Sequence, residues 1–104
     1  MLRHIVFFSA KPGVAPEEIR DGLLQLAAIP GATSFEVVLN TKQDLFANEV
    51  DVVVYAEFPD AETLAAYKAH PVYAECVQVV KPLRELRFSV DIPAGSSRGG
   101  GKEN

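Results

Sequence analysis

Three polar rings follow one another at three-residue spacing in the stretch LAAYKAHPVYAEC (residues 64–76), namely Tyr67, His70 and Tyr73. A further imidazole, His4, lies near the N-terminus. In a mostly apolar cavity, an imidazole close to a phenol can take a proton from a carbon next to a carbonyl while the phenol hydrogen-bonds the developing enolate. His4 as the base and Tyr67 as the hydrogen-bond donor are therefore the candidate catalytic residues.

A structural role explains the same pair of side chains. Buried polar groups must be hydrogen-bonded, so His4 and Tyr67 could satisfy one another or a backbone carbonyl in the core. The sequence shows no third group that would orient the imidazole. Replacing His4 with an apolar residue of similar shape separates the two hypotheses, because only the catalytic one predicts a loss of turnover.

The other two rings have simpler explanations. His70 directly precedes Pro71 in the last turn of a predicted helix, where the helix dipole favours a cation that can bond the terminal carbonyls. We expect it to cap that helix. Tyr73 has helical spacing with Val77 and Val80, which fits either the core or the wall of the same cavity.

The sequence offers few other catalytic or metal-binding groups. Cys76 is the only cysteine, so no internal disulfide is possible, and one cysteine with two histidines cannot fill a structural zinc site. We expect Cys76 to be a small buried hydrophobe. No nucleophile stands beside a base and no carboxylate pair is identifiable, so we predict neither a metal nor a cofactor.

Length and composition are those of one ordinary folded domain: 104 residues, 48% hydrophobic and 23% charged. The net charge is -4 and the basic residues are scattered, which argues against a nucleic-acid partner. The opening apolar stretch is too short for a membrane span and does not resemble a signal peptide. We therefore predict no membrane partner and a cytoplasmic location.

The pattern of apolar residues predicts seven elements. Alternation and β-branched content indicate strands at residues 2–9, 34–40, 51–58 and 86–92. A helix is predicted from Pro16 to about Ile29, because Pro16 suits the first helical position and two glutamates follow it. A second begins after Asp60, a good N-cap, and ends at His70, and a third runs from about residue 72 to Pro82.

This order, β-α-β-β-α-α-β, predicts an α+β, ferredoxin-like split βαβ fold with a four-stranded antiparallel sheet ordered 4-1-3-2 and helices on one face. The opposite face would be lined by Ile5, Phe7, Val53 and Tyr55. Arg87, Ser89 and Asp91 are expected on that same face, at its polar edge. Such a face covers roughly 300 Å², about the largest apolar patch that a soluble monomer leaves exposed.

We therefore predict that two copies pair through the sheet face (Ile5, Phe7, Val53, Tyr55) as a homodimer, a dimeric α+β barrel. The alternative is that a few exposed apolar strand residues need no partner. The long connection between the second and third strands favours the dimer, because its Leu45 and Phe46 would otherwise be apolar residues exposed at a loop tip. Residues 1–93 form the predicted domain, and AGSSRGGGKEN, residues 94–104, has the composition of a flexible tail.

Several stretches together resemble the stress-responsive A/B barrel (Dabb) family: RHIVFF, IPGATSFEVVLN and EFPDAETLAAYKAHPVYAECVQVVKPLRE. The similarity runs from about residue 2 to residue 92. It implies a ferredoxin-like fold that forms a dimeric α+β barrel, as predicted above. It implies little about chemistry, because many members of the family have no assigned activity.

One member with a known reaction is plant olivetolic acid cyclase, which closes a polyketide ring by an aldol reaction without a metal or organic cofactor. The chain is similar to it in His4 and in Tyr67, three residues before the His70-Pro71 pair. It departs from it at Tyr73, where the cyclase has an acid-base histidine. A phenol, with a pKa near 10, is a much poorer base near neutral pH than an imidazole, with a pKa near 6.5.

The leading hypothesis is a homodimeric Dabb domain of undefined activity, whose cavity between helices and sheet holds a small apolar or aromatic ligand. Tyr73, Val52 and Phe8 are the expected ligand contacts. The first alternative is a cofactor-free lyase, cyclase or isomerase that transfers protons with His4 and Tyr67. The second alternative, a cofactor-free oxygenase of aromatic compounds, rests on fold analogy alone.

Overall fold

The computed structural model of the chain describes residues 1–47 and 49–94, so the predicted tail, apart from Ala94, lies outside the described residues. The described elements follow in the order β1 (Leu2–Ala10), α1 (Pro16–Leu23), η1 (Leu24–Ala28), β2 (Ser34–Leu39), η2 (Leu45–Ala47), β3 (Val52–Phe58), α2 (Ala61–Ala69), α3 (Pro71–Val80) and β4 (Arg84–Pro93). The η elements are short 3₁₀ helices. All seven predicted elements are present, and η1 forms the end of the first predicted helix.

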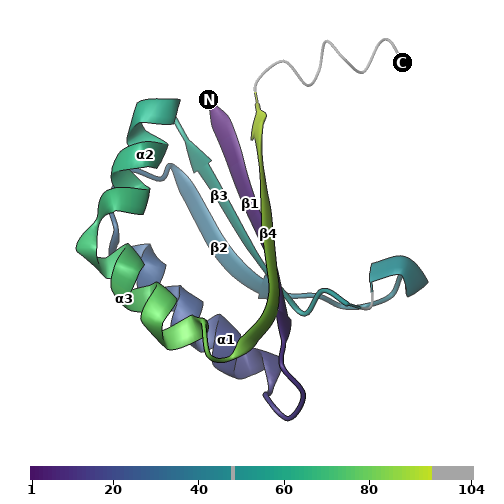
Figure 1. The fold of residues 1–104 in the computed structure, drawn as a ribbon. Coiled ribbons are helices and arrows are strands. Elements are labelled where there is room, and N and C mark those ends of the chain that lie inside the picture. Colours follow the sequence, from purple (N-terminus) through teal and green to yellow (C-terminus); the bar gives the residue numbers. More distant parts are fainter. Residues whose placement is uncertain (48, 95–104) are drawn as a thin grey trace, which may run out of the picture.

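The strands form one antiparallel sheet in the order β2-β3-β1-β4, which is the predicted order 4-1-3-2. Figure 1 shows α1, α2 and α3 together on one side of this sheet. The two central strands, β1 and β3, pair from Leu2 opposite Phe58 to Phe8 opposite Val52. The fold is therefore the predicted ferredoxin-like arrangement, with one helix-covered face and one open face.

Helix starts follow the expected local chemistry. Pro16 occupies the first turn of α1, with Glu17 and Glu18 beside it. Asp60 caps α2, because its Oδ1 accepts a hydrogen bond of 2.8 Å from the backbone N–H of Thr63. These starts place α1 and α2 where their apolar sides reach the sheet.

His70 caps a helix, but not in the predicted way. We expected its side chain to bond the terminal carbonyls of the preceding helix. Instead its Nδ1 accepts a hydrogen bond of 3.1 Å from the backbone N–H of Val72, so the ring caps the N-terminus of α3. Pro71 is the first residue of α3 and has no N–H to bond, which leaves the Val72 N–H as the available donor.

The side of the sheet predicted for the polar residues of β4 is wrong. Residues paired across antiparallel strands point to the same face, and β4 pairs with β1 so that Phe88 lies opposite Phe7 and Asp91 opposite His4. The apolar residues of β4 therefore extend the open face. Arg87, Ser89 and Asp91 instead lie on the helix-covered face.

The core lies in the layer between helices and sheet. Its buried apolar side chains are Val6, Phe8, Ile19, Leu23, Leu26, Ile29, Val52, Val54, Ala56, Phe58, Leu64, Tyr67, Cys76 and Val80. His4 is buried with them, whereas Ser9, also buried, is paired with Leu86 of β4. The helix-facing side of both central strands is thus a continuous apolar wall in which His4 is the one imidazole among the described residues.

The open face is more apolar than predicted. Ile5, Phe7, Val53 and Tyr55 are only half-buried there. Further exposed apolar side chains on this face come from both edge strands: Val38, Leu86, Phe88, Val90 and Ile92. The rings of Phe7 and Phe88 lie 5.2 Å apart between centroids, so the aromatic surface is continuous across the two strands.

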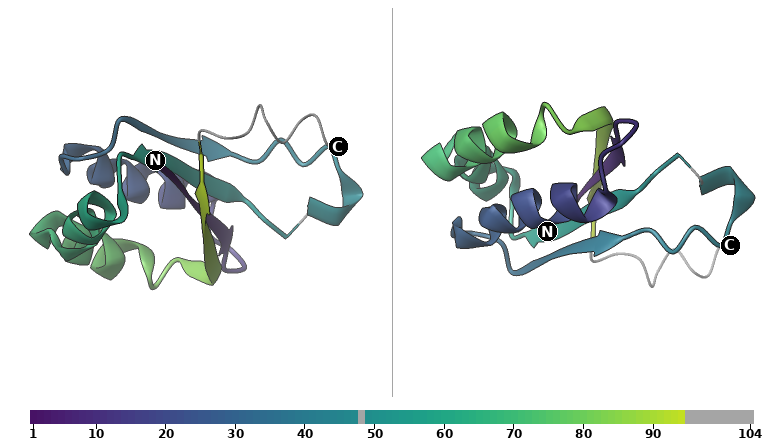
Figure 2. Two further views of the ribbon diagram at one scale, coloured as in Figure 1. Left: turned by 90° about the horizontal axis from the view of Figure 1, so that it is seen from above. Right: turned by 90° about the horizontal axis from the view of Figure 1, so that it is seen from below.

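The connection between β2 and β3 projects beyond the sheet, away from the helices (Figure 2). It carries Leu45 and Phe46, and the Phe46 side chain is 98% exposed. Among the described residues, no helix has the length and apolar composition needed to cross a membrane.

Candidate functional site

A cavity of about 290 Å³ lies between the helices and the covered face of the sheet. Its apolar lining comes from the strands, α1, η1 and α3: Val6, Phe8, Leu23, Leu26, Val54, Cys76, Val77 and Val80. Its polar and charged lining consists of His4, Tyr67, Tyr73, Lys81, Arg84 and Arg87. The two candidate catalytic residues therefore share one mainly apolar space.

His4 is held by a carboxylate that the sequence did not reveal. Its Nδ1 lies 2.5 Å from Oδ1 of Asp91, directly across the β1-β4 pair. A carboxylate only accepts hydrogen bonds, so the proton of a neutral His4 ring sits on Nδ1. Nε2 then carries the free lone pair, and it has no hydrogen-bond partner within residues 1–47 and 49–94.

Burial sets the protonation state of His4. The residue is only 1% exposed, and burial lowers the pKa of its imidazole below the ordinary value of 6.5. The hydrogen bond and the charge of Asp91 raise this pKa and offset part of the effect, whereas Lys68 and Arg87 lower it. Near neutral pH, His4 is therefore a neutral base with its proton directed at Asp91.

Asp91 is partly exposed at the surface. Its side chain is 39% exposed, and its Oδ2 lies 4.0 Å from Nζ of Lys68 on α2. The pair thus links a buried ring to a carboxylate near the surface. This is the arrangement in which a carboxylate fixes the tautomer and orientation of a histidine base.

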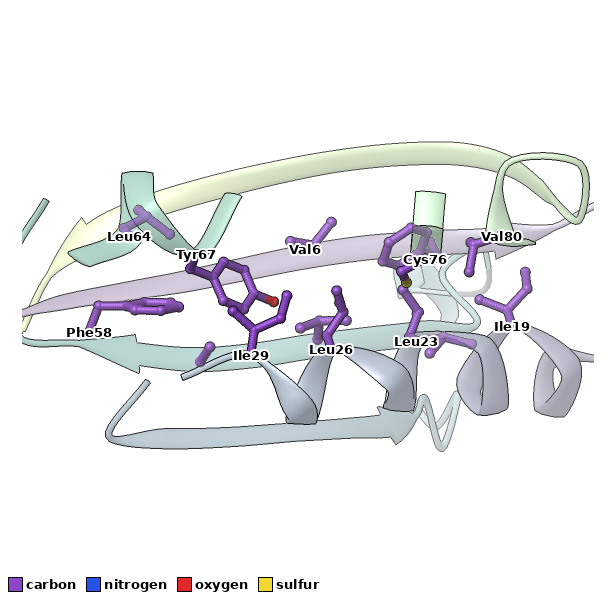
Figure 3. Close-up of a cluster of buried hydrophobic side chains, with 14 residues drawn as sticks. Val6, Ile19, Leu23, Leu26, Ile29, Phe58, Leu64, Tyr67, Cys76 and Val80 are labelled. Carbon is purple, nitrogen blue, oxygen red and sulfur yellow. The ribbon is translucent and has the colours of Figure 1, made fainter. Parts of the chain in front are cut away.

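Tyr67 crosses the interior beside His4. Its ring packs edge-to-face against Phe58, Tyr73 and His4, with centroid distances of 4.9, 5.5 and 6.3 Å. Figure 3 shows its hydroxyl directed into the interior, toward Leu26 and Ile29. No hydrogen-bond partner for this hydroxyl exists in the described part of the chain, and burial raises the phenol pKa, so the group remains a donor.

The alternative in which His4 and Tyr67 satisfy one another does not occur, because no hydrogen bond joins these two described side chains. Tyr73 lines the cavity and its hydroxyl accepts a bond of 3.3 Å from Nη2 of Arg87. Phe8 also lines the cavity. Val52, the third expected ligand contact, is fully buried in the core and is not among the lining residues.

Cys76 is the small buried hydrophobe that we predicted. It is 2% exposed, and its thiol lies 3.5 Å from the backbone carbonyl oxygen of Gly22. Burial raises the thiol pKa to about 11, so the thiolate is scarce near neutral pH. Across the described ranges, no three side chains from His, Cys, Asp and Glu gather closely enough to hold a metal ion.

Asp91 is the residue of the candidate site that sequence reasoning missed. The alternation of β4 supplied only part of the signal: it puts Asp91 on the side opposite Phe88 and Val90, but it does not show which of the two sides faces His4. The register comes from the pairing itself, which aligns Asp91 with His4 across 87 residues of sequence.

Solved structures share this fold. A Dabb family protein with a ferredoxin-like fold from Mesorhizobium loti has 26% sequence identity and a TM-score of 0.72, over 90% of this chain and 97% of that one. A dimeric protein of unknown function from Bacteroides fragilis has 23% identity and a TM-score of 0.70, over 89% and 95%. An antibiotic biosynthesis monooxygenase has 18% identity and a TM-score of 0.72, over 91% and 99%.

Sequence comparison gives the family directly. No protein of curated function matches the chain. The family model described as Stress responsive A/B Barrel Domain (Dabb), however, matches residues 2–94, which include all the strands and helices described above. The chain therefore belongs to the Dabb family.

Proposed function

We propose that this protein transfers a proton to and from a small, mainly apolar or aromatic molecule bound in the cavity, as a lyase, cyclase or isomerase does. The observation that carries the proposal is the His4-Asp91 contact, because it leaves the free Nε2 of a neutral imidazole in an apolar space. A purely structural role also gives the buried Nδ1–H a partner, but it gives no reason for Nε2 to be left without one in the cavity.

In the proposed reaction, Nε2 of His4 takes a proton from a carbon next to a carbonyl. The electron pair of the broken C–H bond moves into the carbonyl group to form an enolate, and the Tyr67 hydroxyl donates a hydrogen bond to the enolate oxygen. His4 then returns the proton to carbon, or the enolate carbon attacks a second carbonyl of the same ligand and the His4 imidazolium gives its proton to the alkoxide that forms. Every step uses groups that line the cavity.

The test is carbon-bound hydrogen exchange. A panel of small phenyl-substituted ketones with acidic α-hydrogens, with phenylacetone as the first probe, is incubated with the protein in D₂O. Deuterium incorporation is followed by NMR. His4→Leu should reduce the protein-catalysed rate by about 10²- to 10⁴-fold, which is the usual contribution of a positioned base. Equal exchange by the wild type and by His4→Leu across the ketone panel would overturn the proposal.

A folding control accompanies this test. His4→Leu should keep its far-ultraviolet circular dichroism and remain cooperatively folded, since it replaces a buried polar group by an apolar one of comparable size. Gln25 is on the exposed side of η1, so Gln25→Ala serves as the matched control and should exchange at the wild-type rate.

The second part of the proposal is the homodimer. We infer that two copies pair through the open sheet face, with Ile5, Phe7, Val53 and Tyr55 at its centre. The exposed apolar residues of β4 and the fully exposed Phe46 support this pairing, because water would otherwise contact them. The cytoplasmic location stays a prediction, and the oxygenase alternative rests only on a shared fold.

A further inference from the structure

The charged residues that line the cavity all carry the same sign. They are Lys81, Arg84 and Arg87, and no aspartate or glutamate is among the lining residues. This concentration of positive charge opposes the net charge of -4 of the whole chain. A cavity that is apolar inside and cationic on one side is complementary to a molecule with an apolar body and an anionic group.

The three cations are close together because of the α3-β4 connection. Lys81 follows directly after α3, Arg84 begins β4, and Arg87 lies opposite Phe8 on the helix-covered face. They therefore approach the cavity from the end where α3 meets the sheet. Figure 1 shows this connection at the end of the sheet away from α2.

None of these cations has an ion pair with a carboxylate among residues 1–47 and 49–94. The polar side-chain contact of Arg87 is the bond from Nη2 to the Tyr73 hydroxyl, which is a neutral acceptor. A guanidinium has five N–H donors, so most of those on Arg87 are available to a ligand. Arginine presents them in a fork that matches the two oxygens of a carboxylate.

One of the three cations, Arg87, also acts on the proposed reacting groups. Burial dominates the pKa of both rings; the charge of Arg87 adds to the lowering at His4 and offsets part of the rise at Tyr67. At about 290 Å³ the cavity is just below the usual range for ligand sites, roughly 300–1,000 Å³. One aromatic ring with short substituents fits such a volume.

We propose that the cavity selects one-ring aromatic carboxylates, whose carboxylate is held by Arg84, Arg87 and Lys81 while the ring extends toward His4 and Tyr67. The location of the ligand rests on the proposed function, since both use the same cavity. The preference for an anion is independent of the proposed function, because it depends on cations that take no part in the proton transfer.

The experiment compares each acid with its neutral counterpart. Matched one-ring carboxylic acids and their primary amides, beginning with 4-acetylbenzoate and 4-acetylbenzamide, are titrated into the wild-type protein and followed by amide NMR shifts. The acids should bind at least about tenfold more tightly than the amides, as expected for charge-assisted hydrogen bonds. Raising the salt concentration should weaken only the binding of the acids.

Variants identify the groups responsible. Arg87→Gln and Arg84→Gln should each reduce the preference for the acid to about threefold or less, and Arg87→Lys should retain part of it, because a lysine keeps the charge and loses the fork. Arg20→Gln is the matched control, since Arg20 is an arginine of α1 that pairs with Asp21 and does not line the cavity. It should bind both probes as the wild type does.

The anion preference is overturned if acids and amides bind equally to the wild type, or if the preference survives in both Arg84→Gln and Arg87→Gln. No binding by any acid overturns it as well. If amides bind equally and His4-dependent exchange persists, only this inference fails. If acids are preferred but exchange does not depend on His4, the inference stands and the proton-transfer function fails.

Discussion

Asp91→Asn is the change that tests the orienting role of the carboxylate most specifically. Asparagine has nearly the same shape and can still accept the Nδ1–H of His4 with its amide oxygen. The change therefore keeps the hydrogen bond and removes the negative charge. It also leaves the cavity unaltered, because Asp91 is not among the lining residues.

The expected loss of rate follows from hydrogen-bond energies and from the exposure of the Asp91 side chain. A hydrogen bond to a charged group contributes about 1.5–3 kcal/mol and a neutral one about 0.5–1.5 kcal/mol, so the lost charge is worth roughly 1–1.5 kcal/mol. Because the Asp91 side chain is 39% exposed, water screens this charge and the lower figure applies. About 1 kcal/mol of lost transition-state stabilisation corresponds to a rate roughly fivefold lower.

The pH profile gives a second readout with a definite sign. Asp91 raises the pKa of His4 through its hydrogen bond and its charge, although burial keeps that pKa below 6.5 overall. Removing the charge should lower the pKa further. The pH at which exchange is half-maximal, on the acid side of the profile, should therefore move to a lower pH in Asp91→Asn.

The assay is the deuterium exchange of phenylacetone between about pH 4.5 and 8, with Asp21→Asn as the control. Asp21 is an exposed carboxylate on α1, and its replacement should change neither rate nor profile. The orienting role would be refuted if Asp91→Asn exchanged at the wild-type rate with an unchanged pH of half-maximal exchange. It would also be refuted if that pH moved to a higher value.

Three further predictions concern other parts of the account. Tyr67→Phe should lower the exchange rate by about 10- to 100-fold, because the hydrogen bond to the enolate oxygen is lost. Its stability in urea unfolding should not fall, because the Tyr67 hydroxyl has no partner among the described residues. Phe88→Asp on the open face should turn the dimer into a monomer in light scattering, whereas Leu24→Asp on the helix side should not; a wild-type monomer would disprove the interface. The free energy of unfolding of the wild type should fall as pH drops below 6.5, because burial lowers the pKa of His4 in the folded state and the unfolded chain then binds more protons. Urea unfolding at a series of pH values measures this, and the His4 contribution to the pH dependence should be missing in His4→Leu.

Much of the fold followed from local pattern. Pro16 and Asp60 begin helices for reasons that lie within a few residues of each, and alternation or β-branched and aromatic content marks the strands. The strand order then follows because few topologies connect these elements simply. Such features depend on neighbouring residues, which is why sequence reasoning could predict them.

The orientation of β4 could not be predicted in the same way. Its alternation of apolar and polar residues shows two different sides but not which side faces the helices. The usual rule turns apolar residues toward the core, yet here Phe88 and Val90 line the open face and Asp91 faces the helices. Because both faces of this sheet are apolar at the centre, the pattern alone does not choose between them.

The candidate site was accordingly predicted in part. His4 and Tyr67 do line one cavity, as their positions on a central strand and on the second helix suggested. Asp91 depends on the register between the first and last strands, and the cations depend on the short connection after α3. Both are long-range features that no local pattern in the sequence specifies.

The tautomer of His4 tests the central claim most directly. Long-range ¹H–¹⁵N NMR of the His4 side chain at pH 7.5 distinguishes a protonated ring nitrogen from an unprotonated one. The account predicts a neutral ring with its proton on Nδ1 and an unprotonated Nε2 facing the cavity. A neutral ring with the proton on Nε2, or a doubly protonated ring at this pH, would contradict it, because neither leaves Nε2 free to act as the base.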